Sequence, residues 1–170
     1  MEKKIHVPIV SKIAISGILI AIGTTTSTLL TIPVFGAKMA PVQHFINVLS
    51  AVLLGPYYAV LNAFSISLLR NLLGTGTLLA FPGSMVGALL ASLMYKYSKN
   101  IYASALGEII GTGILGALLA YPVYAYILGK EAALTFFIVP FSISCIGGAI
   151  IATIFLNIPA IKNFLIKRGE

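Results

Sequence analysis

Acidic side chains are scarce in this sequence: its 170 residues include four glutamates and no aspartate. Charged residues of both signs make up 9% of the chain, whereas soluble domains carry roughly 25%. Hydrophobic residues make up 59%. This composition excludes an ordinary soluble domain. It predicts an all-α integral membrane protein, because a helix hydrogen-bonds its own backbone inside a bilayer.

Residues suited to enzyme chemistry are also few. The single cysteine, Cys145, excludes a disulfide framework and a zinc site built from thiolates. The chain has no glycine-rich phosphate loop, no H-E-x-x-H and no G-x-S-x-G. The lack of aspartate weakens Mg²⁺-dependent phosphoryl transfer, which depends on carboxylates. We therefore expect no enzyme, metal or cofactor. A membrane-embedded hydrolase using His44 and Glu108 is a remote alternative, and so is an assembly subunit without a ligand.

Six apolar segments follow one another with short connections. A helix needs roughly 20 apolar residues to cross a hydrocarbon core about 30 Å thick, so this length holds five or six spans and little else. Gly55-Pro56 and Gly74 to Gly76 mark breaks between segments, and Pro122 should kink the fifth one or end its regular part near Tyr121. We predict one transmembrane domain over residues 1–170, with helices at Val10–Thr31, Val42–Leu54, Tyr57–Leu73, Gly83–Tyr95, Ile101–Leu128 and Leu134–Leu165.

The basic residues are distributed unevenly over the connections. With both termini inside, eight of the eleven lysines and arginines face the cytoplasm, and Lys38, Arg70 and Lys130 fall toward the other side. Positive charge gathers on the cytoplasmic side of membrane proteins. The pattern therefore predicts six spans in the plasma membrane with cytoplasmic N and C termini. It also explains the net charge of +7 without a nucleic-acid partner.

Polar residues inside the predicted spans fall at three- and four-residue spacing, so each group shares one helix face. Lipid would leave such side chains without partners, so three stripes on neighbouring helices predict one enclosed polar cavity. The stripes are Gln43, His44, Asn47 and Ser50; Ser67, Arg70 and Asn71; and Ser104, Glu108 and Thr112.

Glu108 is the most informative residue of these stripes. It lies in a long apolar segment with no lysine or arginine near it in sequence. An ionisable group there costs about 2.5–3.5 kcal/mol on insertion scales, so it needs a partner or a function. Two interpretations stay open: an ion pair with Arg70 that holds helices together, and a contact with a ligand.

Small residues recur at four-residue spacing on several segments, which lets helix backbones approach closely in lipid. Most of these stripes are expected to pack inside the bundle: Gly83, Gly87 and Ala91; Gly107 and Gly111; Ser144, Gly148 and Ala152. The first helix has Gly17 and Ala21 on an otherwise featureless face. That face is our candidate for docking another membrane protein.

Three blocks of sequence are similar to the ThiW family: PVQHFINVLSAVLLGPYYAVL, RNLLGTGTLLAFPGSMVGALLA and GEIIGTGILGALLAYPV. Members are proposed substrate-binding S components of energy-coupling-factor (ECF) vitamin importers. The resemblance implies a six-helix S-component bundle without ATPase activity. Its partners would be a transmembrane coupling subunit and two cytoplasmic ATPases. It also implies a pocket near the outer face, covered here by Pro33–Met39.

The resemblance points to a thiamine precursor as ligand, with hydroxyethylthiazole first and the hydroxymethylpyrimidine half of thiamine as the alternative. A small, nearly neutral aromatic ligand needs an aromatic wall and a few hydrogen bonds. Phe35, Tyr121 and Tyr124 are candidates for the wall, although the tyrosines also suit an interfacial belt. The polar candidates for substrate binding are His44, Asn47, Arg70, Asn71, Glu108 and Thr112.

Overall fold

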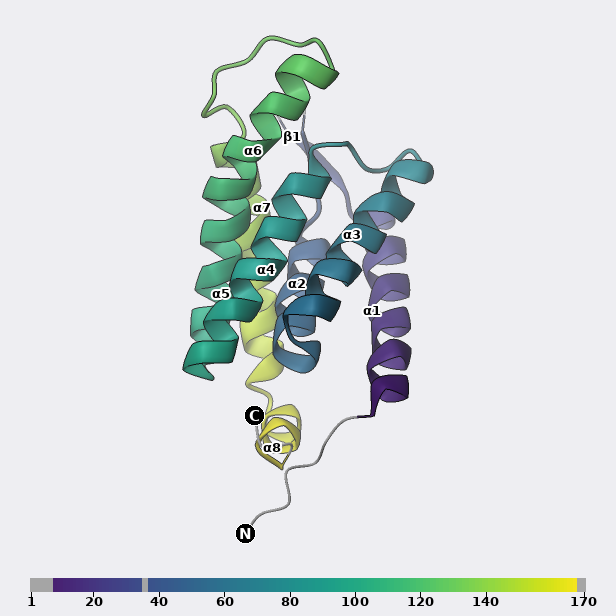
Figure 1. Cartoon of the computed structure of the whole chain (residues 1–170), viewed down its shortest axis with the longest axis vertical. Helices are drawn as coiled ribbons and strands as arrows, with labels where there is room; N and C mark the ends of the chain where they lie inside the picture. The colour runs from purple at the N-terminus through teal and green to yellow at the C-terminus, as the bar shows by residue number, and fades with distance from the viewer. Residues whose placement is uncertain (1–7, 35–36, 168–170) are drawn as a thin grey trace.

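The computed structural model describes residues 8–34 and 37–167. Six helical segments run alternately up and down the long axis of the molecule (Figure 1), in the order α1 (Ile9–Leu29), α2 (Pro41–Leu54), α3 (Pro56–Leu72), α4 (Ala80–Ser98), the unbroken segment 101–127, and α7 (Ile138–Leu156). A short strand pair joins α1 to α2, and α8 (Pro159–Lys167) follows α7. The end of the bundle that carries the strand pair is called the hairpin end below.

The turns between the middle helices confirm the breaks expected from the sequence. Gly55 has φ +84°, a conformation that favours glycine, and Pro56 opens α3 in its first turn. At the far end of α4, Lys99 takes a left-handed conformation with φ 55°. The Asn100 side chain then caps the next helix by accepting a hydrogen bond from the Tyr102 amide at 2.8 Å.

The expected outer loop after α1 is a two-stranded antiparallel hairpin. Strands β1 (Ile32–Val34) and β2 (Ala37–Met39) pair with Ile32 opposite Met39. The Lys38 amino group donates a hydrogen bond to the Gly74 carbonyl at 2.8 Å, which ties the hairpin to the α3–α4 connection. The hairpin is therefore held against the α3–α4 connection.

The fifth segment confirms the expectation for Pro122. It contains α5 (Ile101–Ile110), a π-helical stretch η1 (Gly111–Gly116), α6 (Ala117–Pro122) and a second π-helical stretch η2 (Val123–Ile127). The regular α-helix therefore ends at Pro122, next to Tyr121. The segment continues past the proline with wider hydrogen bonding, as between the Leu128 amide and the Val123 carbonyl at 3.0 Å.

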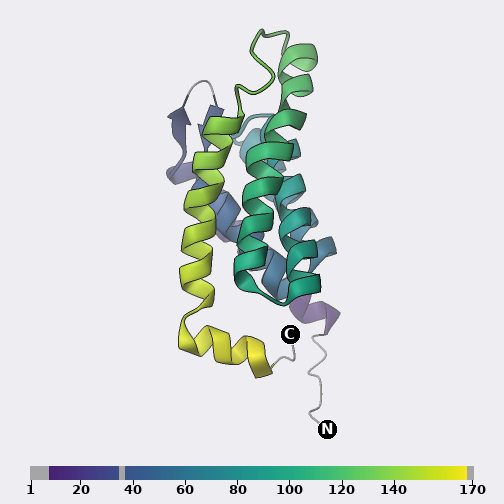
Figure 2. The ribbon, with the colours of Figure 1, turned by 90° about the vertical axis from the view of Figure 1, so that its left-hand side faces the viewer.

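The sixth segment is not one long helix, contrary to the predicted span Leu134–Leu165. α7 ends at Leu156, and α8 begins at Pro159 in a new direction, across the foot of the bundle (Figure 2). A residue before proline is disfavoured in helical conformation, which explains a break at this point. The start of α1 and the whole of α8 lie at the end opposite the hairpin (Figure 1).

The outer surface is rich in large apolar side chains. Ile13 on α1 and Ile154 on α7 are 59% and 67% exposed. Among the described residues, three helices are long and apolar enough to cross a membrane: Ile9–Leu29, Ile101–Ile127 and Ile138–Leu156; Pro41–Leu54 is a shorter apolar helix. An apolar surface of this extent suits contact with lipid.

Glycines bring α4 and the fifth segment into backbone contact, as expected for internal stripes. A Cβ atom added at Gly111 would lie 2.7 Å from the Gly87 Cα, and one added at Gly116 would lie 2.7 Å from the Gly83 Cα. A Cβ atom added at Gly107 would likewise lie 2.9 Å from the Ala91 Cα. Only glycine permits this approach, and it sets Glu108 directly against α4.

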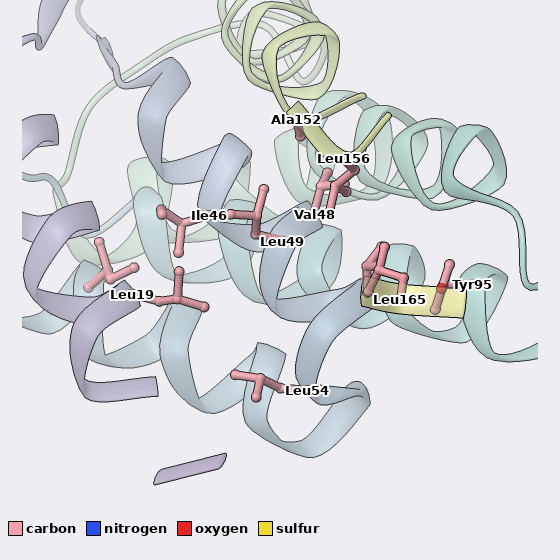
Figure 3. Close-up of a cluster of buried hydrophobic side chains, with 11 residues drawn as sticks. Leu19, Ile46, Val48, Leu49, Leu54, Tyr95, Ala152, Leu156 and Leu165 are labelled. Atoms are coloured by element: carbon pink, nitrogen blue, oxygen red, sulfur yellow. The ribbon is translucent and has the colours of Figure 1, made fainter. Parts of the chain in front are cut away.

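One apolar cluster joins α1, α2, α3, α4, α7 and α8. Figure 3 shows it, with Leu19, Ile46, Leu49, Tyr95, Leu156 and Leu165 among its members. A second apolar cluster forms on α6 and at the starts of α4 and α7, from Leu79, Ala117, Ala120 and Phe137. Buried polar side chains lie mainly on α2, α3, α4 and the fifth segment.

Candidate functional site

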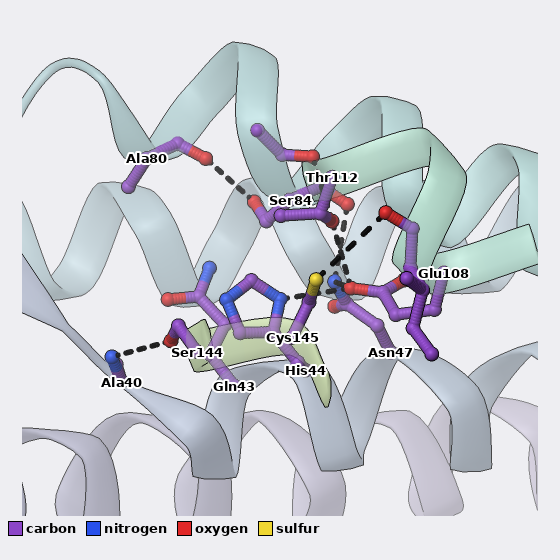
Figure 4. Close-up of polar contacts among 12 residues, drawn as sticks. Ala40, Gln43, His44, Asn47, Ala80, Ser84, Glu108, Thr112, Ser144 and Cys145 are labelled. Atoms are coloured by element: carbon purple, nitrogen blue, oxygen red, sulfur yellow. Dashed lines mark hydrogen bonds and ion pairs between the residues drawn. The ribbon is translucent and has the colours of Figure 1, made fainter. Parts of the chain in front are cut away.

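Glu108 is fully buried, and one of its carboxylate oxygens takes three hydrogen bonds. His44 Nδ1 lies 2.8 Å, Thr112 Oγ1 2.9 Å and Asn47 Nδ2 3.0 Å from Oε1 (Figure 4). These donors come from α2 and from the next turn of Glu108's own segment. Three such donors stabilise an ionised carboxylate in a medium of low dielectric constant.

The number of hydrogens that its neighbours can donate limits the hydrogen bonds around Glu108. Asn47 uses both amide hydrogens, one on Glu108 and one on the Ser84 carbonyl at 3.1 Å. Thr112 has one hydrogen and two acceptors in reach, because the Gly83 carbonyl lies 3.2 Å from its hydroxyl. Within the described residues, the second oxygen, Oε2, has no hydrogen-bond partner.

His44 connects this network to the interior space of the bundle. With Glu108 ionised, Nδ1 must carry the shared hydrogen, so Nε2 is an acceptor in neutral histidine and a donor in protonated histidine. Nε2 points away from Glu108 (Figure 4), and His44 lines a cavity there. The histidine can therefore bind a ligand through Nε2 while Glu108 orients its ring.

The expected ion pair between Arg70 and Glu108 is not formed. Arg70 sits at the hairpin end of α3, and its guanidinium donates to the Gln43 side chain, to Thr31 Oγ1 at 3.1 Å and to the Thr75 carbonyl at 3.4 Å. Glu108 lies deeper in the bundle and pairs with His44 instead. The difference in depth along the bundle explains why the two charges do not meet.

A chain of polar contacts nevertheless links the two groups. Gln43, which accepts from Arg70, donates to Ser67 Oγ at 2.8 Å, and the Ser67 and Ser84 hydroxyls are 2.9 Å apart. The backbone of Ser84 then receives the amide of Asn47. Residues from all three predicted polar stripes thus meet in one network across four helical segments. Two stripe members lie outside it: Ser50 accepts from Asn62, and Ser104 Oγ has no hydrogen-bond partner among the described residues.

A cavity of about 30 Å³ lies beneath the hairpin, between Arg70 and His44. Its walls come from β2, α2, α3, the α3–α4 connection, α4, η1 and α7, through Lys38, Met39, Ala40, Gln43, His44, Arg70, Thr77, Ala80, Gly83, Ser84, Thr112, Pro140, Phe141 and Ser144. Ala40 closes one edge by donating its amide to Ser144 Oγ at 3.0 Å (Figure 4). This volume accommodates one or two water molecules.

The predicted site residues fall into three groups around this cavity. His44, Arg70 and Thr112 line it, whereas Asn47 and Glu108 lie behind His44. Asn71 has a different role, because its amide donates to the Ser67 and Thr77 carbonyls and holds the α3–α4 connection.

The aromatic residue in the cavity wall is not one of those predicted from the sequence. Tyr124 packs edge-on against Phe137 at 4.9 Å, and Tyr121 lines a separate surface depression beside Lys130, so neither tyrosine lines the cavity. Phe35 lies outside the described residues. Phe141 of α7 is the aromatic residue of the cavity wall. It gave no signal in the sequence, because it is one of several aromatic residues in an apolar run.

The candidate docking face on α1 is free within the described structure. Gly17 and Ala21 are exposed, and no atom lies within 4 Å of a Cβ added at Gly17. α1 packs on α2 and α3 through its opposite side, with Leu19 and Gly23 buried there.

The sequence of the chain is similar to a known protein family. A sequence model described as thiamine-precursor transporter protein (ThiW) matches residues 13–161. The chain belongs to the ThiW family. No curated protein and no solved structure gives a significant match. Together with the apolar helices, the family makes this a membrane transport protein for a thiamine precursor. The description of the family is that of a transporter, not of an enzyme.

Proposed function

We propose that this ThiW protein is the substrate-binding S component of an ECF-type importer in the plasma membrane. It would capture a thiamine precursor, with hydroxyethylthiazole as the first candidate, on the outer side. A transmembrane coupling subunit and two cytoplasmic ATPases would supply the energy. The whole chain, residues 1–170, forms one substrate-binding domain in this proposal.

The distribution of charge supports six crossings with both chain ends in the cytoplasm. The end opposite the hairpin carries Lys12, Lys96, Lys99 and Lys162, whereas the hairpin end carries Lys38, Arg70 and Lys130. By the positive-inside rule, the hairpin end is external. The cavity then lies close to the outer surface, where an importer captures its ligand.

The observation that carries the proposal is the cavity beneath the hairpin, with His44 Nε2 available to it. Gln43, Thr77 and Ser144 add hydrogen-bonding groups to the wall, and Phe141, Met39 and Pro140 add an aromatic and apolar surface. A small heteroaromatic ring with one polar substituent needs this combination. Glu108 holds the His44 ring in place from behind, at 2.8 Å.

The cavity must widen to admit a ligand of that size, because about 30 Å³ is too small for a five-membered ring with substituents. The hairpin is the wall that can move at least cost. Two hydrogen bonds beyond the strand pairing hold the hairpin: Lys38 Nζ bonds the Gly74 carbonyl, and the amide of Ala40, the residue after β2, bonds Ser144 Oγ. We propose that breaking these bonds opens the site.

Docking to the coupling subunit is assigned to α1. Gly17 and Ala21 form an exposed stripe of small residues, which permits close contact with another helix in lipid. The cavity uses no side chain of α1. Ligand capture and docking are therefore separate functions of separate faces.

Isothermal titration of the purified protein with hydroxyethylthiazole, hydroxymethylpyrimidine and thiamine tests the substrate. We expect heat of binding from hydroxyethylthiazole, and loss of that signal in His44→Ala. Ile150→Ala, on the apolar outer face of α7, is the matched control and should bind as wild type does. Binding of hydroxymethylpyrimidine alone would transfer the site to the other half of thiamine. Binding of none of the three would overturn the proposal.

A further inference from the structure

Arg70 is a buried cation without a countercharge among the described residues. Its side chain is 2% exposed, and it lines the cavity. Of its five N–H groups, three have acceptors: the Gln43 side chain, Thr31 Oγ1 and the Thr75 carbonyl. Its Nε is buried without a hydrogen-bond partner in the described part of the chain.

Among the described residues, no carboxylate forms an ion pair with Arg70. The ion pair found within residues 8–34 and 37–167 joins Glu108 to His44, and Glu108 Oε1 is already occupied by three donors. Lys38, a second cation, also lines the cavity and bonds a backbone carbonyl. The cavity wall therefore presents two cations at its hairpin side.

Burying an unpaired guanidinium is costly, because arginine does not lose its proton in proteins. All three acceptors around Arg70 are neutral, so they replace lost hydration without neutralising the charge. A ligand anion would supply both the missing acceptor and the countercharge. Arginine at such a site favours a carboxylate or a phosphate, both of which accept several hydrogen bonds.

We infer that the cavity takes a thiamine precursor that carries an anionic group, a carboxylate or a phosphate ester, bound by Arg70 with support from Lys38. The inference rests on the proposed function and specifies the substrate class of the same site. The ring of the precursor lies toward His44 and Phe141, and the anionic group lies toward the hairpin. Neutral hydroxyethylthiazole supplies the ring but no anionic group for Arg70.

A purely structural role for Arg70 makes a different prediction. Through Thr31, Thr75 and Gln43, the guanidinium joins the base of the hairpin, the α3–α4 connection and α2. If that were its whole role, replacing it would weaken binding of neutral and anionic ligands by similar factors. An anion site instead changes the ratio of the two affinities within one variant.

The test is isothermal titration with three matched probes: hydroxyethylthiazole, its phosphate ester, and 4-methylthiazole-5-carboxylate. For wild type we expect at least one anionic probe to bind about tenfold or more tighter than the neutral alcohol, as charge-assisted hydrogen bonds do. The two anionic arms separate a phosphate from a carboxylate site. Arg70→Gln should remove the preference and Arg70→Lys should keep part of it, while the neutral alcohol reports whether each variant folds.

Lys38→Gln provides a second variant at an exposed position, and the neutral alcohol reports any effect of losing the bond from Lys38 to the Gly74 carbonyl. It should lower anion affinity a few-fold, and added salt should weaken the anionic probe but not the neutral one. Equal or tighter binding of the neutral alcohol by wild type would overturn the inference and leave the proposed function standing. Failure of all three probes to bind would instead count against the proposed function.

Discussion

Two stripes of small residues in this protein share one sequence pattern and have opposite surroundings. On α4, a Cβ added at Gly83 would lie 2.9 Å from the Phe141 ring of α7, and one added at Gly87 would clash with the Thr112 hydroxyl of the fifth segment. On α1, Gly17 has open space around it, and Ala21 beside it is exposed. Small residues at four-residue spacing permit close helix contact without specifying whether the second helix belongs to the same chain.

The difference between the stripes shows where the bundle is complete and where it is not. The α4 stripe creates the site, because the missing side chain at Gly87 leaves room for the Glu108 carboxylate. At Gly17, the α1 stripe faces open space within the described part of the chain. Its space is consistent with a helix from a coupling subunit, which is the role proposed for it.

The largest effect is expected from Gly87→Leu. A Cβ at Gly87 would clash with the Thr112 hydroxyl and lie 2.7 Å from Glu108 Oε2, so a leucine should separate α4 from the fifth segment. Overpacking of this kind costs about 1–3 kcal/mol or more. We expect a sharp fall in melting temperature and in the yield of monodisperse protein. Gly17→Leu is the matched control, and a similar loss there would refute the contrast between the stripes.

The next largest effect is expected at the carboxylate that the α4 stripe accommodates. Glu108→Ala leaves the donors of His44 and Asn47 without their acceptor, while Thr112 can still donate to the Gly83 carbonyl; each unsatisfied buried group costs about 1–3 kcal/mol. Glu108→Gln keeps an oxygen in place and should cost less. Thermal unfolding should rank wild type above Gln and Gln above Ala. Identical melting and ligand binding in all three would show that the network has no important role.

A smaller and more selective effect is expected on the open stripe. Gly17→Trp or Ala21→Trp should leave melting temperature and ligand binding unchanged, because no described residue contacts that space at Gly17. Co-purification with the coupling subunit should be lost, since an indole keeps the helix backbones apart. Ile150→Trp on α7 controls for bulk on the apolar surface. Normal co-purification of both α1 variants would place the docking face elsewhere.

The smallest perturbation comes from single cysteines introduced to map topology, in a background that lacks Cys145. Positions 38 and 130 lie at the hairpin end, and position 97 lies near the far end of α4. A membrane-impermeant thiol reagent applied outside intact cells should label positions 38 and 130, and position 97 only after permeabilisation. Labelling of position 38 from the cytoplasm alone would invert the proposed orientation.

Much of the helical framework could be predicted, because apolar segments and turn residues are local signals. Gly55-Pro56 placed the α2–α3 turn to within a residue, and residues from all three polar stripes do meet in one buried network. The end of the regular helix at Pro122 was also predicted, whereas the predicted span Leu134–Leu165 was wrong. Whether a helix absorbs a proline through wider hydrogen bonding, as before Leu128, or breaks before one, as at Pro159, depends on packing around it.

The pairing of charges could not be predicted, because it depends on helix shifts of a few ångströms. The sequence allowed Arg70 as the partner of Glu108, but the register of α2 brings His44 to 2.8 Å instead. The aromatic wall was missed for a similar reason: Phe141 faces the cavity through the rotation of α7, which an evenly apolar helix does not reveal. Long-range geometry decided each of these points.

The most direct test of the central claim compares two neighbouring variants by titration with hydroxyethylthiazole. Thr77 lines the cavity, and Leu78, the next residue, does not line it and is 41% exposed. If the space beneath the hairpin is the substrate site, Thr77→Phe should fill it and abolish binding, whereas Leu78→Phe should bind like wild type. Wild-type affinity in Thr77→Phe would contradict the account.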